Sequence, residues 1–75
     1  MSTDTLSRVV ALVRDVYGTA QPIAADTALD EDSIGLAILA MSVEREFGVV
    51  LPWRTEEAWR TVADVVAAIE KARGA

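Results

Sequence analysis

The chain has 75 residues, with 12 acidic and 7 basic side chains, a formal charge of −5, and neither cysteine nor histidine. This inventory excludes a disulfide, a thiolate metal site and a Ser-His triad, and we expect no metal site and no enzymatic activity. Nucleic-acid binding is not expected, because an acidic chain repels phosphate backbones. A length near the lower limit for one hydrophobic core predicts one domain over residues 1–75.

The N-terminal sequence has no basic segment followed by an apolar run, so it does not resemble a signal peptide. The longest uncharged run, residues 33–43, is too short to cross a bilayer. We therefore expect a cytoplasmic, soluble and monomeric protein with no membrane partner. Its negative charge would steer it toward basic patches on protein partners.

The first predicted helix runs from about Asp4 to Tyr17, and Gly18 is a suitable C-terminal stop. Apolar residues recur on one face of it, at Leu6, Val9, Val10, Val13 and Tyr17. The following segment, residues 19–32, contains Pro22 and several acids, which predicts a loop. It is long for a connection between helices, and loops of this length are often functional.

The second predicted helix begins at Asp32 or Ser33 and ends at Phe47, with Gly48 as its stop. One face is suited to the core and carries Leu36, Leu39, Ala40, Val43 and Phe47. A second apolar face carries Ile34, Ala37, Ile38 and Met41. Either Ile34 or Ile38 packs under the long loop, or this face is an exposed surface for docking partners.

Pro52 bars the second helix from continuing, and residues 55–59 predict one short helical turn capped by Thr55. Thr61 and Asp64 have the spacing of a capping box for a last helix. The inner face of that helix carries Val62, Val65, Val66 and Ile69. The predicted fold is all-α, a small four-helix bundle of three main helices and one short helix.

Ser33 allows three interpretations. As a cap, it or Asp32 satisfies free N–H groups at the start of the helix. As a nucleophile, it lacks a histidine, a nearby lysine and a nucleophile-elbow motif, so this interpretation fails. As a site modified by another enzyme, it lies at a helix N-terminus, which favours a phosphodiester, after a loop that can expose it.

The segment "DSIGLAILAMSVEREFGVVLP" resembles the acyl carrier protein family, whose members have Asp-Ser-Leu or Asp-Ser-Ile at the start of the second helix. The end of that helix in the family matches Glu44, Glu46, Phe47, Gly48, Leu51 and Pro52. Trp59 matches an apolar residue that ends a short third helix, and "T-V-x-D-V" matches Thr61, Val62, Asp64 and Val65. The resemblance covers roughly the whole chain.

The resemblance implies an acyl carrier protein whose Ser33 receives 4'-phosphopantetheine from coenzyme A through a phosphopantetheinyl transferase. The thiol of that arm would hold an acyl group as a thioester. It also implies that Asp32 presents Ser33 to the transferase, and that Ile34 and Met41 touch partner enzymes such as an acyl-loading enzyme, a ketosynthase or tailoring enzymes. We place Gly35 and Ile38 with this docking face. An aminoacyl or peptidyl carrier, and an unmodified helical adaptor of the same fold, remain alternatives.

Several positions depart from the family pattern. Asp30 and Glu31 stand where a pair such as Leu-Gly is usual, and the loop is several residues short. Gly35 replaces a polar residue, and Ile38 replaces a common glutamate, so the helix is apolar where carriers of fatty-acid synthesis are acidic. These departures favour polyketide or other secondary-metabolite biosynthesis over fatty-acid synthesis. We expect Gly35 to permit close approach of a partner or the arm, and Trp53 to pack within its loop.

Overall fold

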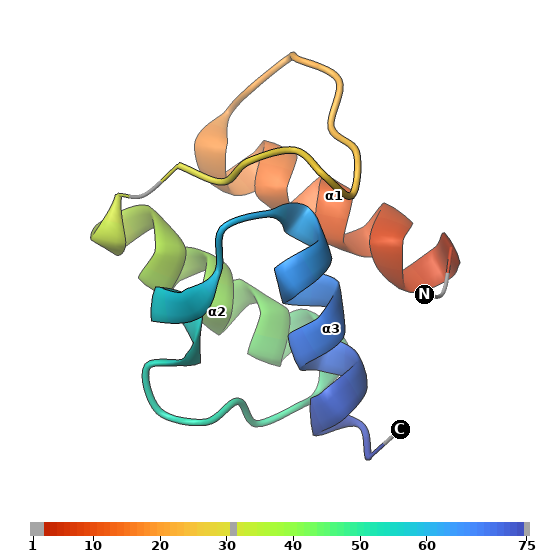
Figure 1. The fold of residues 1–75 in the computed structure, drawn as a ribbon, viewed down its shortest axis with the longest axis vertical. Helices are drawn as coiled ribbons and strands as arrows, with labels where there is room; N and C mark the ends of the chain where they lie inside the picture. Colours follow the sequence, from red (N-terminus) through yellow and green to blue (C-terminus); the bar gives the residue numbers. More distant parts are fainter. Residues whose placement is uncertain (1–2, 31, 75) are drawn as a thin grey trace.

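The computed structural model describes residues 3–30 and 32–74, and Glu31 therefore lies outside the described residues. Three α-helices and one 3-10 turn follow one another along the chain (Figure 1): α1 spans Thr3–Tyr17, α2 Ser33–Phe47, η1 Thr55–Ala58 and α3 Val62–Ala72. Within the described ranges, the β-type pairing is limited to an isolated bridge between Ala28 and Thr61. The predicted all-α architecture is confirmed, and no described helix is long and apolar enough to span a membrane.

The core forms because each helix turns one apolar face inward, as the sequence periodicity predicts. Helix α1 contacts both α2 and α3, and η1 contacts α2 and α3. The predicted inner faces of α2 and α3 are buried, apart from Phe47, which is half-buried. The buried apolar residues are Val9, Val13, Leu29, Leu36, Leu39, Ala40, Val43, Leu51, Trp59, Val62, Val65, Val66 and Ile69.

The ends of α2 follow the predicted signals. Gly48 adopts the left-handed conformation, with φ of 65°, and its N–H donates to the carbonyl of Glu44. This conformation is strained for residues with a Cβ, so a glycine ends the helix at low cost. A carboxylate oxygen of Glu44 accepts a hydrogen bond of 2.8 Å from the Leu51 N–H, which fixes the chain beyond the helix end.

The start of η1 differs from the prediction. Thr55 is the first residue of the turn rather than its cap, and Arg54 occupies the N-cap position with φ of 63°. A non-glycine residue in the left-handed region is uncommon, and the Arg54 guanidinium pairs with the carboxylate of Glu57 one turn later. The predicted capping box of Thr61 and Asp64 at the start of α3 is confirmed.

Backbone hydrogen bonds tie the loop between α1 and α2 to the start of α3. The N–H of Leu29 donates to the carbonyl of Arg60 at 2.8 Å, and the N–H of Val62 donates to the carbonyl of Thr27 at 3.1 Å. In Figure 1 this loop passes over α1 and descends to the first turn of α2. The buried Leu29 anchors it to the core. These contacts fix the position from which the chain enters α2.

Candidate functional site

Ser33 is the first residue of α2, and the residue before it caps the helix. One carboxylate oxygen of Asp32 accepts a hydrogen bond of 3.1 Å from the N–H of Ile34. The N–H of Asp32 in turn donates to a carboxylate oxygen of Asp30 at 3.2 Å. The capping role that the sequence assigned to either residue therefore belongs to Asp32.

The hydroxyl of Ser33 is consequently free for another role. Ser33 is exposed, and no hydrogen bond found among the described residues involves its side chain. The first turn of α2 contains no acidic residue, and the carboxylate that engages one of its N–H groups is that of the N-cap residue Asp32. A helix N-terminus of this kind favours a negatively charged group bonded to the exposed hydroxyl.

Two arginines share a surface hollow with Ser33. Arg54 and Arg60 line this hollow of about 440 Å³ together with Ser33, Leu36 and Glu57. Hydrogen bonding to the Glu57 carboxylate raises the pKa of Arg54, whose guanidinium stays positively charged. The guanidinium of Arg60 donates to the backbone carbonyls of Glu57 and Trp59. Because the Glu57 carboxylate pairs with Arg54, the lining of the hollow carries one net positive charge beside Ser33.

The second apolar face of α2 points outward. The side chains of Ile34 and Met41 are 70% and 68% exposed, and Ile38 is 48% exposed. The interpretation that Ile34 or Ile38 packs under the long loop is therefore wrong. Ala37, between them, is half-buried. The predicted residues Ile34, Ile38 and Met41 form a continuous exposed stripe that begins one residue after Ser33, because their spacing repeats every three or four residues.

Gly35 does not belong to this stripe, which corrects its assignment as a docking residue. The residue is buried, and a Cβ built on it would lie 2.9 Å from Cε1 of Tyr17. Real Cβ atoms do not approach a ring carbon so closely, so the absent side chain lets the Tyr17 ring of α1 pack against the first turn of α2. Close approach is the correct reason for this glycine, but it is made by α1 rather than by a partner or the arm.

Trp53 also differs from its prediction. Its side chain is 87% exposed and does not pack into the loop. The guanidinium of Arg54 lies 5.0 Å from the centroid of its ring. Trp53 and Met41 line a surface hollow of about 400 Å³ between α2 and η1. The exposed apolar surface therefore extends from α2 onto the segment before η1.

The sequence reasoning missed the site roles of Arg54, Arg60 and Tyr17. The two arginines follow Ser33 by more than twenty positions and reach it because η1 packs against α2. No local pattern marks such a contact. Tyr17 was recognised as a residue of the inward face of α1, and only Gly35, a glycine inside a helical pattern, signalled that a side chain must approach closely there.

Comparison with known protein families identifies the chain. The family model described as the phosphopantetheine attachment site matches residues 7–69. The chain belongs to this family. No solved structure matches it. The match confirms the resemblance to acyl carrier proteins, and it implies a covalently attached 4'-phosphopantetheine. Carrier domains of this family are non-catalytic, and they generally interact with a phosphopantetheinyl transferase and with acyl-handling enzymes.

The residues around the start of α2 fit such a group. A phosphodiester needs a free hydroxyl, hydrogen-bond donors and a positive field, and these are present at Ser33, at the first turn of α2, and at Arg54 and Arg60. Asp32 faces the N–H of Ile34, so its charge is already engaged by the helix. When bound, the arm would supply a thiol that this cysteine-free chain lacks.

Proposed function

We propose that Ser33 is the attachment point of the 4'-phosphopantetheine arm and that the chain carries acyl intermediates of polyketide or other secondary-metabolite biosynthesis. The exposed Ser33 hydroxyl, relieved of capping by Asp32 and lying within the matched residues 7–69, carries the proposal. The arm holds the acyl group as a thioester, and the chain itself performs no reaction on it.

The modification requires a partner enzyme, because the chain has no histidine and no base engages the Ser33 hydroxyl among the described residues. The Ser33 oxygen forms a bond to the phosphorus that bears pantetheine. The pyrophosphate bond of coenzyme A breaks, and adenosine 3',5'-bisphosphate leaves with the electron pair. The hydroxyl proton passes to a base of the transferase. Asp32 would present Ser33 by fixing the backbone of the first turn.

The exposed stripe of Ile34, Ile38 and Met41 supports a pathway with its own partner enzymes. A patch of this kind beside a modified residue favours docking through apolar contact. Met41 suits such a surface because its flexible side chain adapts to different partners. The acyl-loading enzyme, ketosynthase or tailoring enzymes that accept this carrier should therefore present an apolar docking surface rather than only a basic one.

The first experiment measures intact mass after incubation with coenzyme A and a broad-specificity phosphopantetheinyl transferase. The wild type should gain the mass of one phosphopantetheine, and Ser33→Ala should gain none while melting at nearly the same temperature. Ser7→Ala, which removes an exposed serine from α1, is the matched control and should be modified like the wild type. A folded wild-type chain that gains no mass would leave the unmodified adaptor as the function.

The second experiment tests the docking face. Ile38→Glu should lower turnover by the cognate acyl-handling enzyme at least tenfold while the helix content and melting temperature change little. Val50→Glu is the matched control, because Val50 is equally apolar, 86% exposed and outside α2. Equal turnover by both variants would exclude Ile38 from docking, and a large loss of stability in Ile38→Glu would assign it to the core.

A further inference from the structure

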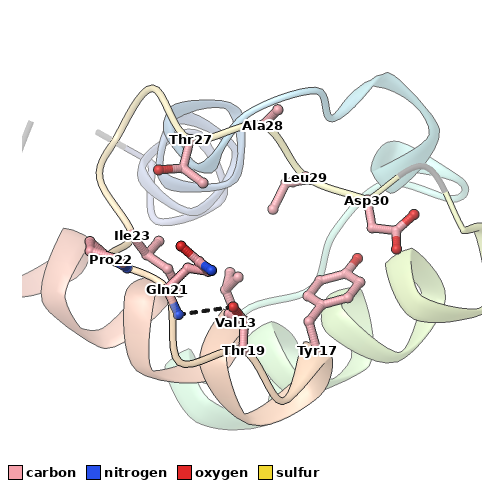
Figure 2. A pocket seen from close by; sticks show the side chains of 10 residues that line it. All are labelled: Val13, Tyr17, Thr19, Gln21, Pro22, Ile23, Thr27, Ala28, Leu29 and Asp30. Carbon is pink, nitrogen blue, oxygen red and sulfur yellow. Dashed lines mark hydrogen bonds between the residues drawn. The ribbon is translucent and has the colours of Figure 1, made fainter.

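Ser33 follows an acidic stretch of the loop and faces a basic hollow on the side of η1. On the loop side, Asp30 lies beside Tyr17 (Figure 2), and both line a pocket of about 380 Å³ between α1 and the loop that leads to α2. On the side of η1, Ser33 shares its hollow with Arg54 and Arg60, and that lining carries one net positive charge. A phosphodiester on Ser33 carries one negative charge, so it is drawn toward η1.

Arg54 belongs to two hollows at once. It lines the hollow beside Ser33, and it also lines the hollow between α2 and η1 that contains Met41 and Trp53. Among the described residues it is the one that the two linings share. Its guanidinium pairs with the carboxylate of Glu57 in the first hollow and lies 5.0 Å from the ring centroid of Trp53 in the second. The guanidinium therefore connects the two hollows.

The backbone of Arg54 indicates that an arginine side chain is needed at this position. Its φ of 63° lies in the left-handed region, which glycine or asparagine adopts at lower cost. The ion pair with Glu57 does not explain the arginine, because both side chains are more than half exposed and such pairs add little stability. A contact that forms only in the modified chain would account for it.

Arg60 is already positioned to hold the same anion. One nitrogen of its guanidinium, Nη1, donates to the backbone carbonyls of Glu57 and Trp59 at 2.9 and 3.2 Å. These are the hydrogen bonds found for this guanidinium among the described residues, so its other N–H groups are open to a ligand. A guanidinium presents its donors in a rigid fork that matches phosphate oxygens. The phosphodiester thus meets one fixed cation and one exposed cation, Arg54.

We propose that Arg54 changes partner when the arm is attached. Its guanidinium leaves the Glu57 carboxylate and the Trp53 ring and pairs with the phosphodiester on Ser33, which Arg60 also holds. The inference rests on the proposed attachment at Ser33. The phosphodiester prevails over the carboxylate because it interacts with two guanidinium groups, whereas the Glu57 carboxylate pairs with one.

The exchange changes the charge around Trp53. Glu44 and Glu56 also line that hollow, and Arg54 is the basic residue of its lining. Once Arg54 pairs with the phosphodiester, an exposed tryptophan ring and two carboxylates remain, and this combination favours a cationic side chain of a partner enzyme. An acyl-handling enzyme that places an arginine or lysine on Trp53 thereby distinguishes the modified chain from the unmodified one.

Collisional quenching of tryptophan fluorescence tests the exchange. Of the two tryptophans, Trp53 is exposed and Trp59 is buried, so quenchers in solution reach Trp53. A guanidinium over the ring attracts the anion iodide and leaves neutral acrylamide unaffected, so the ratio of their quenching constants reports the charge at Trp53. This ratio should fall about two- to threefold when the wild type receives phosphopantetheine from coenzyme A. Quenching by the cation caesium should increase.

Arg54→Gln removes the charge and keeps a residue of similar backbone preference, so the variant should melt at nearly the same temperature as the wild type. Its iodide-to-acrylamide ratio should be low before modification, and any change on modification then measures the phosphodiester charge alone. Arg14→Gln is the matched control, because Arg14 is exposed on α1 and lines neither hollow. It should behave like the wild type. A fall in the wild type no larger than that in Arg54→Gln would overturn the exchange.

Phosphorus NMR observes the other partner in the exchange. The phosphodiester resonance of the modified wild type should differ from that of modified Arg54→Gln, and Arg54→Lys, which keeps the charge, should give a resonance between them. Equal resonance positions in the three proteins would overturn the pairing of Arg54 with the phosphodiester. A folded chain that gains no mass would instead overturn attachment at Ser33, so the two failures are distinguishable.

Discussion

Helices α3 and α2 begin with different arrangements of hydrogen bonds. At α3, one carboxylate oxygen of Asp64 accepts from the N–H groups of Arg60 and Thr61, at 2.8 and 3.0 Å. At α2, the carboxylate of Asp32 accepts a single hydrogen bond from the N–H of Ile34 and caps the helix, and the exposed Ser33 follows directly. The first turn of α3 contains an acid, whereas that of α2 contains none.

We infer from this difference that the start of α3 contributes to stability, whereas the start of α2 is left available for function. The acid inside the first turn of α3 places a negative charge at the positive end of that helix, which disfavours the binding of another anion there. The first turn of α2 is held mainly by packing, since Gly35 lies against Tyr17 and Leu36 is buried. Because the first turn of α2 packs against the core through Gly35 and Leu36, its opposite side stays exposed to solvent. A serine that another enzyme modifies has to lie on such an exposed side.

The largest expected effect comes from removing the packing under α2. Gly35→Val should lower the free energy of unfolding by about 2 kcal/mol, because its side chain would overlap the Tyr17 ring, and either the ring or the first turn of α2 must shift. Urea denaturation measures the change. Ile34→Val, at the exposed neighbouring position, should change stability by less than about 0.5 kcal/mol. Equal stability of both variants would show that packing does not hold this turn.

A smaller loss is expected at the start of α3. Asp64→Ala removes the acceptor of two backbone N–H groups and should lower the free energy of unfolding by about 1–2 kcal/mol. The rate of phosphopantetheine transfer to the folded chain should stay unchanged, because this turn is not the site. Asp64→Asn keeps an oxygen acceptor, so its free energy of unfolding should fall less than that of Asp64→Ala. A transfer rate that fell with stability would contradict the separation of the two helix starts.

Asp32 should have both roles, each of modest size. Asp32→Ala should cost about 0.5–1 kcal/mol through the lost cap, and it should also slow transfer to Ser33. Asp32→Ser keeps a capping oxygen without the charge, so its stability should be close to that of the wild type. Phosphopantetheine transfer should remain slow in this variant if the transferase contacts the carboxylate of Asp32. Transfer that recovers together with stability would reduce Asp32 to a cap. Denaturation and the kinetics of mass gain measure the two effects separately.

Features set by neighbouring residues could be predicted from the sequence. Asp32 before an apolar periodic segment and Gly48 after it mark the two ends of α2, and the spacing of Ile34, Ile38 and Met41 predicts a second face. These depend on local hydrogen bonding and on the helical period. They therefore do not require knowledge of how the helices pack.

Features set by the path of the loop could not be predicted. The pairing of Ala28 with Thr61 determines how the chain crosses the molecule, and with it the pocket beside Tyr17. The same long-range packing explains the role of Gly35. The left-handed conformation of Arg54 was missed for another reason, since such a conformation is expected of glycine or asparagine rather than arginine.

The smallest effects should appear in the pH dependence of stability. The start of α3 should respond in acid, and the residue that packs against the start of α2 should respond in alkali. Hydrogen bonds from the N–H groups of Arg60 and Thr61 lower the pKa of Asp64 below its usual 3.8. The unfolded chain then binds a proton before the folded chain does. The stabilisation is fully present above pH 3.8 and is lost as the pH falls through the pKa of the folded state.

Tyr17 should produce the reverse behaviour in alkali, because burial raises its pKa above the usual 10.0. Its contribution is complete below pH 10 and is lost as the pH rises through the pKa of the folded state, since the unfolded chain releases its proton first. Denaturation across pH should show an acid slope that is smaller in Asp64→Asn and an alkaline slope that is smaller in Tyr17→Phe. The chain has one tyrosine, so the second difference isolates the residue that packs against the first turn of α2. An alkaline slope unchanged by Tyr17→Phe would show that its hydroxyl is not buried in solution, whereas the acid slope of Asp64 would still stand.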